Sequence, residues 1–218
     1  MLNLLNKKQD ISLLQKYSHA LNQVEKNSDI EQKLSAFNDV LSFCSKDLSC
    51  LNDNSRKRDM VLYWTYKNIG DILMEKTDKE KSSDYTGAKE NYQRALNFSR
   101  NSEEKISVLE RLTHLYEKSG DTANLYNVKD LLAETYPNFQ KREAFENLAD
   151  SVADVTRKIY FLEKALDFVK NENVATITRG ENTMRICEKL RTIYAEKKDY
   201  ANLARIEELR RNTSYLIH

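Results

Sequence analysis

The sequence contains few of the residues that interrupt regular structure. Its 218 residues include only four glycines and one proline, Pro137. All-β and α/β folds place glycine and proline in many of their turns, and therefore use these residues more often. The composition predicts an all-α protein.

The sequence also has no excess of charge of either sign. Lys and Arg number 35 and Asp and Glu number 34, so the formal net charge is +1. Binding to nucleic acid requires a basic face, and the basic clusters at residues 56–58 and 210–211 are short. We interpret these clusters as solvated helix ends and loops, and we expect no nucleic-acid partner.

Long apolar runs are missing as well. No run approaches the roughly 20 residues that a membrane-spanning helix needs. The apolar start of MLNLLNKKQD is shorter than the ~7–15 residues of a secretory signal. We therefore expect a cytoplasmic protein with no membrane partner.

Motifs for catalysis and metal binding are absent from the sequence. The four glycines stand alone, whereas a phosphate-binding loop needs several close together. Cys44 and Cys50 do not have the spacing of a zinc site, the histidines do not cluster near them, and the three cysteines fit reduced thiols. Neither HExxH nor GxSxG occurs. We expect no enzyme activity, no cofactor and no metal.

One feature that the sequence does have is an internal repeat. Residues 111–135 and 189–213 align without a gap and are identical at eight of 25 positions. In both copies the apolar residues lie three and four apart, which is the helical period. The period is interrupted at EKSGD and EKKDY, where Gly120 suits a left-handed helix end and Asp121 suits the cap of the next helix. Each copy is therefore predicted to be a helical hairpin.

Weaker copies of this hairpin fill most of the chain. They occupy residues 16–43, 66–98 and 144–169. Helical hairpins that recur every 30–50 residues are typical of α-solenoids. We predict an all-α fold, an α-solenoid of about five antiparallel helical hairpins.

Two polar segments depart from the pattern. Residues 45–59 are rich in turn formers and are interpreted as a linker or altered loop. Residues 171–182 are similar around Gly180, although VATIT could instead begin a helix. The predicted organisation is an N-terminal hairpin unit (1–47), a linker (48–59) and a helical repeat array (60–218).

The pattern of large and small residues resembles the tetratricopeptide repeat (TPR) family. The second hairpin carries Tyr66, Ile69 and Gly70 and then Ala88, Tyr92 and Ala95, and the third ends in Pro137. The small residues would let neighbouring helices approach closely. The resemblance implies a right-handed superhelix with a concave groove lined by the first helix of each hairpin. Some members of this family bind C-terminal carboxylates through a clamp of two Asn, two Lys and one Arg. Asn22, Asn68 and Arg111 stand at matching positions here, but Ser18 and Ser107 replace the two lysines. This removes most of the required positive charge, so we do not expect a carboxylate clamp.

The resemblance also assigns residues to the predicted groove. Trp64, the only tryptophan, is either a binding residue or part of the core, because tryptophan is common in both places. The groove residues implied by the resemblance are Trp64, Lys67, Asn68, Asp71, Ser107, Glu110, Arg111, His114, Glu146 and Asp150.

Together, these features predict a non-catalytic adaptor or scaffold that binds a protein or peptide segment in its groove. An alternative is a ligand-responsive regulator, in which the array binds a short signalling peptide. Formation of a homodimer is a further alternative, because arrays whose terminal helices expose apolar faces tend to associate.

Overall fold

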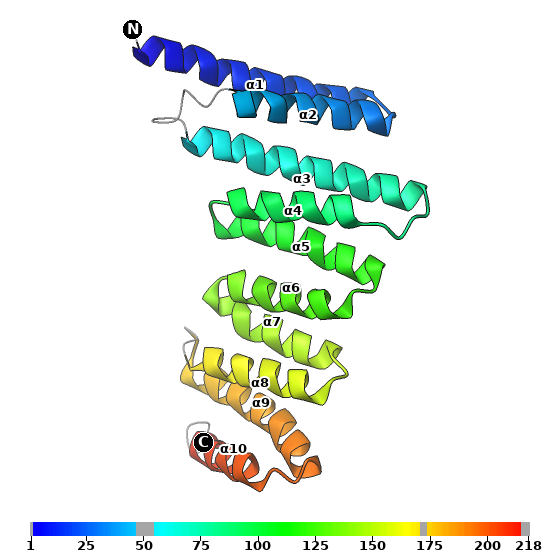
Figure 1. Ribbon diagram of the computed structural model, residues 1–218. Coiled ribbons are helices and arrows are strands. Elements are labelled where there is room, and N and C mark those ends of the chain that lie inside the picture. Colours follow the sequence, from blue (N-terminus) through cyan, green and yellow to red (C-terminus); the bar gives the residue numbers. More distant parts are fainter. Residues whose placement is uncertain (1, 47–54, 171–173, 215–218) are drawn as a thin grey trace. The chain divides into compact units, whose positions relative to one another are not determined.

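The computed structural model describes residues 2–46, 55–170 and 174–214, and gives the side chains of the first stretch from residue 13 to residue 45. The described residues form ten helices and no strand, so the all-α prediction is confirmed (Figure 1). The helices are α1 (Leu2–Lys26), α2 (Ile30–Lys46), α3 (Ser55–Lys79), α4 (Thr86–Phe98), α5 (Ser102–Ser119), α6 (Thr122–Thr135), α7 (Asn138–Ser151), α8 (Val155–Val169), α9 (Thr176–Glu196) and α10 (Tyr200–Ser214).

The chain forms two compact units, Met1–Val128 and Lys129–His218. In the first unit α1 packs against α2, α2 against α3, α3 against α4, and α4 against α5. In the second unit α7 packs against α8, α8 against α9, and α9 against α10. Each of these helices therefore packs against the helix that precedes or follows it in sequence.

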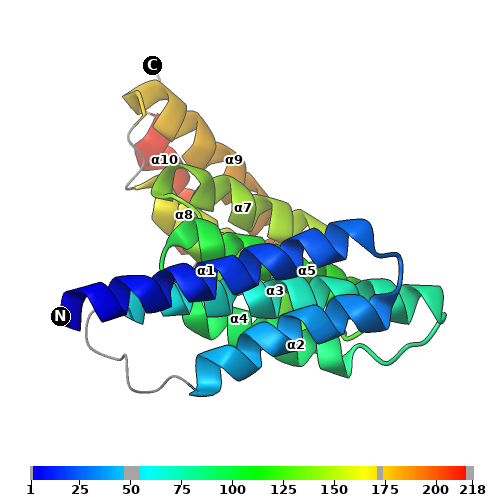
Figure 2. The ribbon, with the colours of Figure 1, turned by 90° about the horizontal axis from the view of Figure 1, so that it is seen from above.

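The N-terminal hairpin shares its core with α3. Ala20 of α1 and Phe37 and Val40 of α2 belong to the same buried cluster as Val61 and Ile69 of α3. Figure 2 shows α1 and α2 lying across α3. The first unit, Met1–Val128, therefore contains the N-terminal hairpin together with α3. The division into a hairpin unit (1–47), a linker and an array stays a prediction.

The predicted linker at 48–59 falls only partly within the described residues. Positions 48–54 lie outside them, and α3 already begins at Ser55. In the second polar segment (171–182), the residues from Thr176 onward are helical, because α9 begins at Thr176 and Gly180 is buried within it. Position 180 therefore lies within a helix and does not mark a turn.

The predicted repeat boundaries have the expected local structure. Gly120 adopts a left-handed conformation, with φ of 72°, at the end of α5. Asp121 accepts a hydrogen bond from the backbone N–H of Asn124 (3.1 Å) and one from its side chain (2.6 Å). Asp199 and Asn202 form the same pair of bonds, at 3.2 and 2.8 Å. Both helix starts are thus capped as the repeat predicts.

Candidate functional site

Eight of the ten predicted groove residues lie on α3 and α5, in the first unit. We call this set (Trp64, Lys67, Asn68, Asp71, Ser107, Glu110, Arg111 and His114) the α3–α5 face. The two helices lie side by side, because the hydroxyl of Tyr63 donates to the backbone carbonyl of Glu104 (3.0 Å) and Lys118 pairs with Asp78 (2.5 Å). The structure therefore brings these eight residues onto two neighbouring helices.

Trp64 is held in place but remains partly accessible. Its ring meets that of Tyr63 edge-on, with centroids 5.0 Å apart. The ammonium of Lys67 lies 5.7 Å from the centroid of the Trp64 ring, a cation–π arrangement. The residue is nevertheless 39% exposed. Trp64 therefore presents a positioned aromatic surface to solvent.

Asp71 is the centre of the polar contacts on this face. Its carboxylate accepts a hydrogen bond from the hydroxyl of Tyr92 (2.8 Å) and lies 3.2 Å from Nε of Arg111 and 3.5 Å from Nζ of Lys67. Burial raises the pKa of Tyr92, and the adjacent Asp71 carboxylate raises it further. The hydroxyl of Tyr92 therefore stays protonated and acts as a donor.

Two of the three residues that match the carboxylate-clamp pattern have partners within the chain. Asn68 donates to the hydroxyl of Tyr17 on α1 (3.1 Å), and Arg111 pairs with Asp71. Burial raises the pKa of Tyr17 to about 12, although the hydrogen bond from Asn68 acts in the opposite direction. Asn22 of α1 is exposed, as are Glu110 and His114 of α5, whereas Ser107 is half-buried. Asn68 and Arg111 therefore bridge helices in this structure.

The other two predicted residues, Glu146 and Asp150, lie on α7 in the second unit. They line a hollow of about 480 Å³ between α7 and α9, which we call the α7–α9 hollow. Its lining residues are Arg142, Glu143, Glu146, Asn147, Asp150, Asn182, Arg185 and Lys189. Arg185 donates to both carboxylate oxygens of Glu146, at 3.1 and 2.7 Å, and Lys189 donates to both oxygens of Asp150, at 2.9 and 2.7 Å.

Glu146 is buried, with only 5% of the residue exposed. It also pairs with Arg142 at 2.5 Å. Burial by itself would raise the pKa of Glu146, but hydrogen bonds from Arg185 and Arg142 and their positive charges outweigh it and lower the pKa. Glu146 is therefore ionised at neutral pH.

The cationic partners in the α7–α9 hollow were missed by sequence reasoning. Arg185 and Lys189 each lie 39 residues after the carboxylate that they bind. The spacing in the α3–α5 pairs is similar, since Lys118 lies 40 residues after Asp78. An acidic residue followed by a basic one at the repeat spacing is a signal in the sequence that would have found them.

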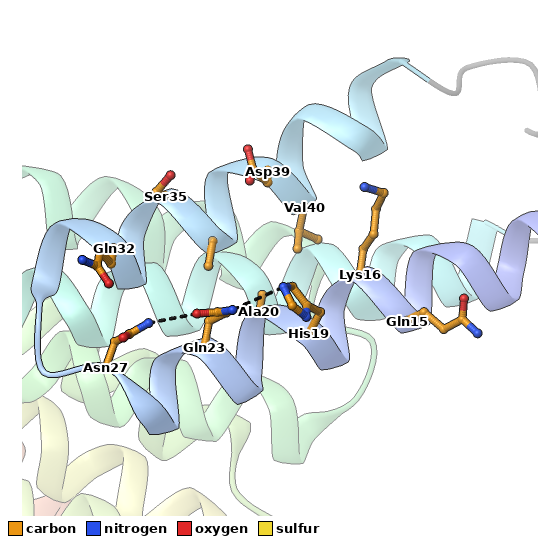
Figure 3. A pocket seen from close by; sticks show the side chains of 11 residues that line it. Gln15, Lys16, His19, Ala20, Gln23, Asn27, Gln32, Ser35, Asp39 and Val40 are labelled. Atoms are coloured by element: carbon orange, nitrogen blue, oxygen red, sulfur yellow. Dashed lines mark hydrogen bonds between the residues drawn. The ribbon is translucent and has the colours of Figure 1, made fainter.

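A third feature, the hollow between α1 and α2, had no signal in the sequence. It has a volume of about 630 Å³ and is lined mainly by polar side chains, over buried Ala20 and Val40. Figure 3 shows the side chains of His19 and Gln23 on α1, and of Asn27 just after it, in a row. Asn27 donates to the carbonyl oxygen of the Gln23 side chain (2.9 Å), and the Gln23 amide nitrogen lies 3.4 Å from Nε2 of His19. Such a surface offers both donors and acceptors and little net charge.

Among the described residues, no three His, Cys, Asp or Glu side chains are arranged to hold a metal ion. Cys44 and Cys187 are buried free thiols. None of the described helices combines the length and the apolar character needed to cross a membrane.

Comparisons with known proteins do not assign the chain to a family. No family model matches it, and no curated protein matches it. The structure of BtubC (BKLC) from P. vanneervenii aligns over 97% of this chain and 90% of its own, with 14% identity and a TM-score of 0.34. This similarity is too low to support a conclusion about fold or function.

Proposed function

We propose that this protein is a non-catalytic adaptor or scaffold that binds a protein or peptide segment. In this proposal the helical pairs belong to a TPR-like solenoid, and the partner binds the groove formed by the first helices of successive hairpins. The α3–α5 face would form part of this groove, and Trp64 would be its anchor.

The proposal rests mainly on Trp64, whose side chain is partly exposed and yet held in place by its neighbours. An exposed indole fixed by Tyr63 and Lys67 loses little conformational freedom when a partner covers it. Trp is also among the residues that contribute most to protein–protein binding. Asp71 and Arg111 lie on the same face as Trp64, and such polar residues at the rim of an interface can make binding specific for one partner.

The ion pairs at the repeat spacing support the solenoid part of the proposal. In the first unit Asp71 and Asp78 of α3 pair with Arg111 and Lys118 of α5. In the second unit Glu146 and Asp150 of α7 pair with Arg185 and Lys189 of α9. In all four pairs the acid precedes the base by about one repeat, as expected if equivalent helices of successive hairpins lie side by side.

A peptide selection tests the proposal. A displayed library of random peptides would be selected against the full chain, and the binders would be measured by fluorescence anisotropy against the wild type and Trp64→Ala. The control is Tyr200→Ala, which removes an aromatic residue that is 70% exposed on α10. We expect Trp64→Ala to weaken binding by ~10-fold or more, which corresponds to about 1.4 kcal/mol, and Tyr200→Ala to leave it unchanged.

Other outcomes are equally informative. If the selected peptides bind both variants as tightly as the wild type, the α3–α5 face is not the binding surface. If no peptide is selected, the proposed function is wrong. A marked change in the radius of gyration upon peptide binding would favour the ligand-responsive regulator.

A further inference from the structure

We propose that the α7–α9 hollow binds an extended peptide in which acidic and basic residues alternate. The acidic side chains would pair with Arg185 and Lys189, and the basic side chains between them would face the carboxylates of α7. This inference rests on the proposed peptide-binding function and adds the chemistry of the partner.

The charges of the hollow are sorted onto its two walls. At the exposed rim, α7 presents Glu143, Asn147 and Asp150, and α9 presents Arg185 and Lys189. Much of this charge is accessible, because the side chains of Arg185, Lys189 and Asp150 are 48%, 31% and 53% exposed. One wall is therefore acidic and the other basic.

A charged group of a ligand would not bind favourably in the buried part of the hollow. The side chains of Arg142 and Glu146 are only 16% and 7% exposed, and they form an ion pair. A carboxylate of the ligand placed this deep would be repelled by ionised Glu146. The acidic side chains of a ligand would therefore bind at the rim, where Arg185 and Lys189 are accessible.

The spacing of the two cations fits an extended chain. Arg185 and Lys189 are four residues apart on α9, which corresponds to about 6 Å along the helix axis. Side chains two positions apart in an extended chain lie on the same side, about 6.6–6.8 Å from each other. Two acidic residues separated by one position thus match the two cations.

The residue between the two acids would point to the opposite wall. There the carboxylates of Glu143 and Asp150 favour a basic side chain. The exposed carboxamide of Asn147 between them has a donor and an acceptor for the peptide main chain. The hollow contains equal numbers of carboxylates and cations. A ligand with charges of one sign would therefore bind less tightly than a ligand in which acidic and basic residues alternate.

Binding requires that the existing pair of Lys189 with Asp150 be exchanged for pairs with the ligand, and that the Arg185 guanidinium be shared between Glu146 and the ligand. This pair is short, at 2.7 Å, but exposed, and exposed ion pairs contribute little net stability. The hollow can therefore exchange its rim contacts while the buried pair of Glu146 with Arg142 stays intact.

Two peptides of identical composition test the inference. One is a fluorescein-labelled peptide of sequence AEKEKEA, and the other has the charges in blocks, AEEEKKA. Anisotropy titrations with the full chain at low salt should show ~5-fold tighter binding of the alternating peptide, since its ion pairs are geometrically matched. Equal affinities, or tighter binding of the block peptide, would overturn the inference.

A charge swap tests the location of the site without removing an ion pair. The double variant Asp150→Lys with Lys189→Asp keeps the pair but leaves one charge of each sign on each wall, and it should weaken binding of the alternating peptide by ~10-fold. The matched control swaps Asp78 and Lys118, a pair of the same kind in the first unit, and should leave binding unchanged. Circular dichroism would check that both variants are folded, and if either is not, the comparison of the two peptides on the wild type decides.

The failure of this inference is distinguishable from failure of the proposed function. If selected peptides require Trp64 but the alternating peptide does not bind, only the charge pattern proposed for the α7–α9 hollow is wrong. If neither class of peptide binds, the proposed function is wrong as well.

Discussion

Gly70 of α3 and Tyr92 of α4 are in such close contact that there is no space for a side chain on Gly70. A Cβ atom at position 70 would lie 2.6 Å from Cε1 and 2.7 Å from Cδ1 of Tyr92. The ring cannot easily move away, because Tyr92 is only 1% exposed and its hydroxyl is bonded to Asp71. The contact fixes how closely the two helices pack.

Gly70→Ala should therefore destabilise the protein, although alanine favours a helix over glycine by ~1 kcal/mol. Overpacking in a buried contact costs about 1–3 kcal/mol, so we expect a net loss of about 1 kcal/mol, with a larger loss for Gly70→Leu. Urea unfolding followed by circular dichroism measures both. The control is Gly87→Ala, at an exposed position whose nearest neighbour is a flexible Leu73 methyl group. An unchanged unfolding midpoint for Gly70→Leu would show that the helices are not packed as described.

Removing the charge of Glu146 should be costly. Glu146→Gln removes a buried carboxylate that pairs with both Arg142 and Arg185, and we expect a loss of about 2–4 kcal/mol in the free energy of unfolding. Asp150→Asn, in an exposed pair with Lys189, is the matched control and should cost no more than ~0.5 kcal/mol. Similar losses for the two variants would contradict the difference in burial.

The stability contributed by Glu146 should also depend on pH. Although burial acts to raise the pKa of Glu146, its arginine partners lower it in the folded protein. The unfolded chain then binds the proton more readily, so this stability is present above the ordinary glutamate pKa of about 4.3 and is lost as the pH falls through the lower folded-state pKa. Unfolding experiments between neutral pH and pH ~3 should therefore show a smaller acid loss for Glu146→Gln than for the wild type. Parallel curves would mean that Glu146 has no shifted pKa.

The two repeated caps should make equivalent contributions. Asp121→Ala and Asp199→Ala each remove the acceptor for the first turn of the following helix, and each should lower the melting temperature by roughly 2–4 °C. Asparagine can also cap a helix, so Asp121→Asn and Asp199→Asn are the controls and should be close to wild type. Differential scanning calorimetry measures all four variants, and an unaffected alanine variant would show that its cap is unnecessary.

The buried cysteines should be unreactive while the protein is folded. Burial raises the pKa of Cys187 to about 11 and also raises the pKa of Cys44, where Arg58 opposes the effect. Because the thiolate is the reactive form, only a small fraction of Cys187 is reactive at pH 8. Iodoacetamide labelling with peptide mapping should modify Cys44 and Cys187 only after urea unfolding. Rapid labelling of either residue in buffer would show that its surroundings open.

Much of the secondary structure was predictable because its signals are local. The helical period of the apolar residues and the cap at Asp121 depend on residues within a few positions of each other. The close approach at Gly70 was also predictable, from the small residues of the second hairpin. The start of α3 was not, because the polar residues from Ser55 to Asp59 are typical of a loop and become helical as part of a longer, packed helix.

Only part of the candidate site could be predicted. That the eight residues of the α3–α5 face lie on two neighbouring helices follows from the helical period, whereas their contacts do not. The sequence did not indicate that Lys67 would be only 8% exposed beneath an accessible Trp64, or that Asn68 would bond to Tyr17. These contacts join residues from different helices, and their existence depends on the rotation of each helix about its own axis.

The sequence by itself therefore determined that the chain is helical, where several of the helices end and which residues repeat, because neighbouring residues decide these features. Tertiary structure decided which charged side chains are buried and which partners they find. Glu146 and Asp150 look alike in the sequence, but packing of α9 against α7 and α8 buries the first among arginines and leaves the second at the rim. The free energy of a charge depends on its surroundings, and those surroundings exist only once distant segments have come together.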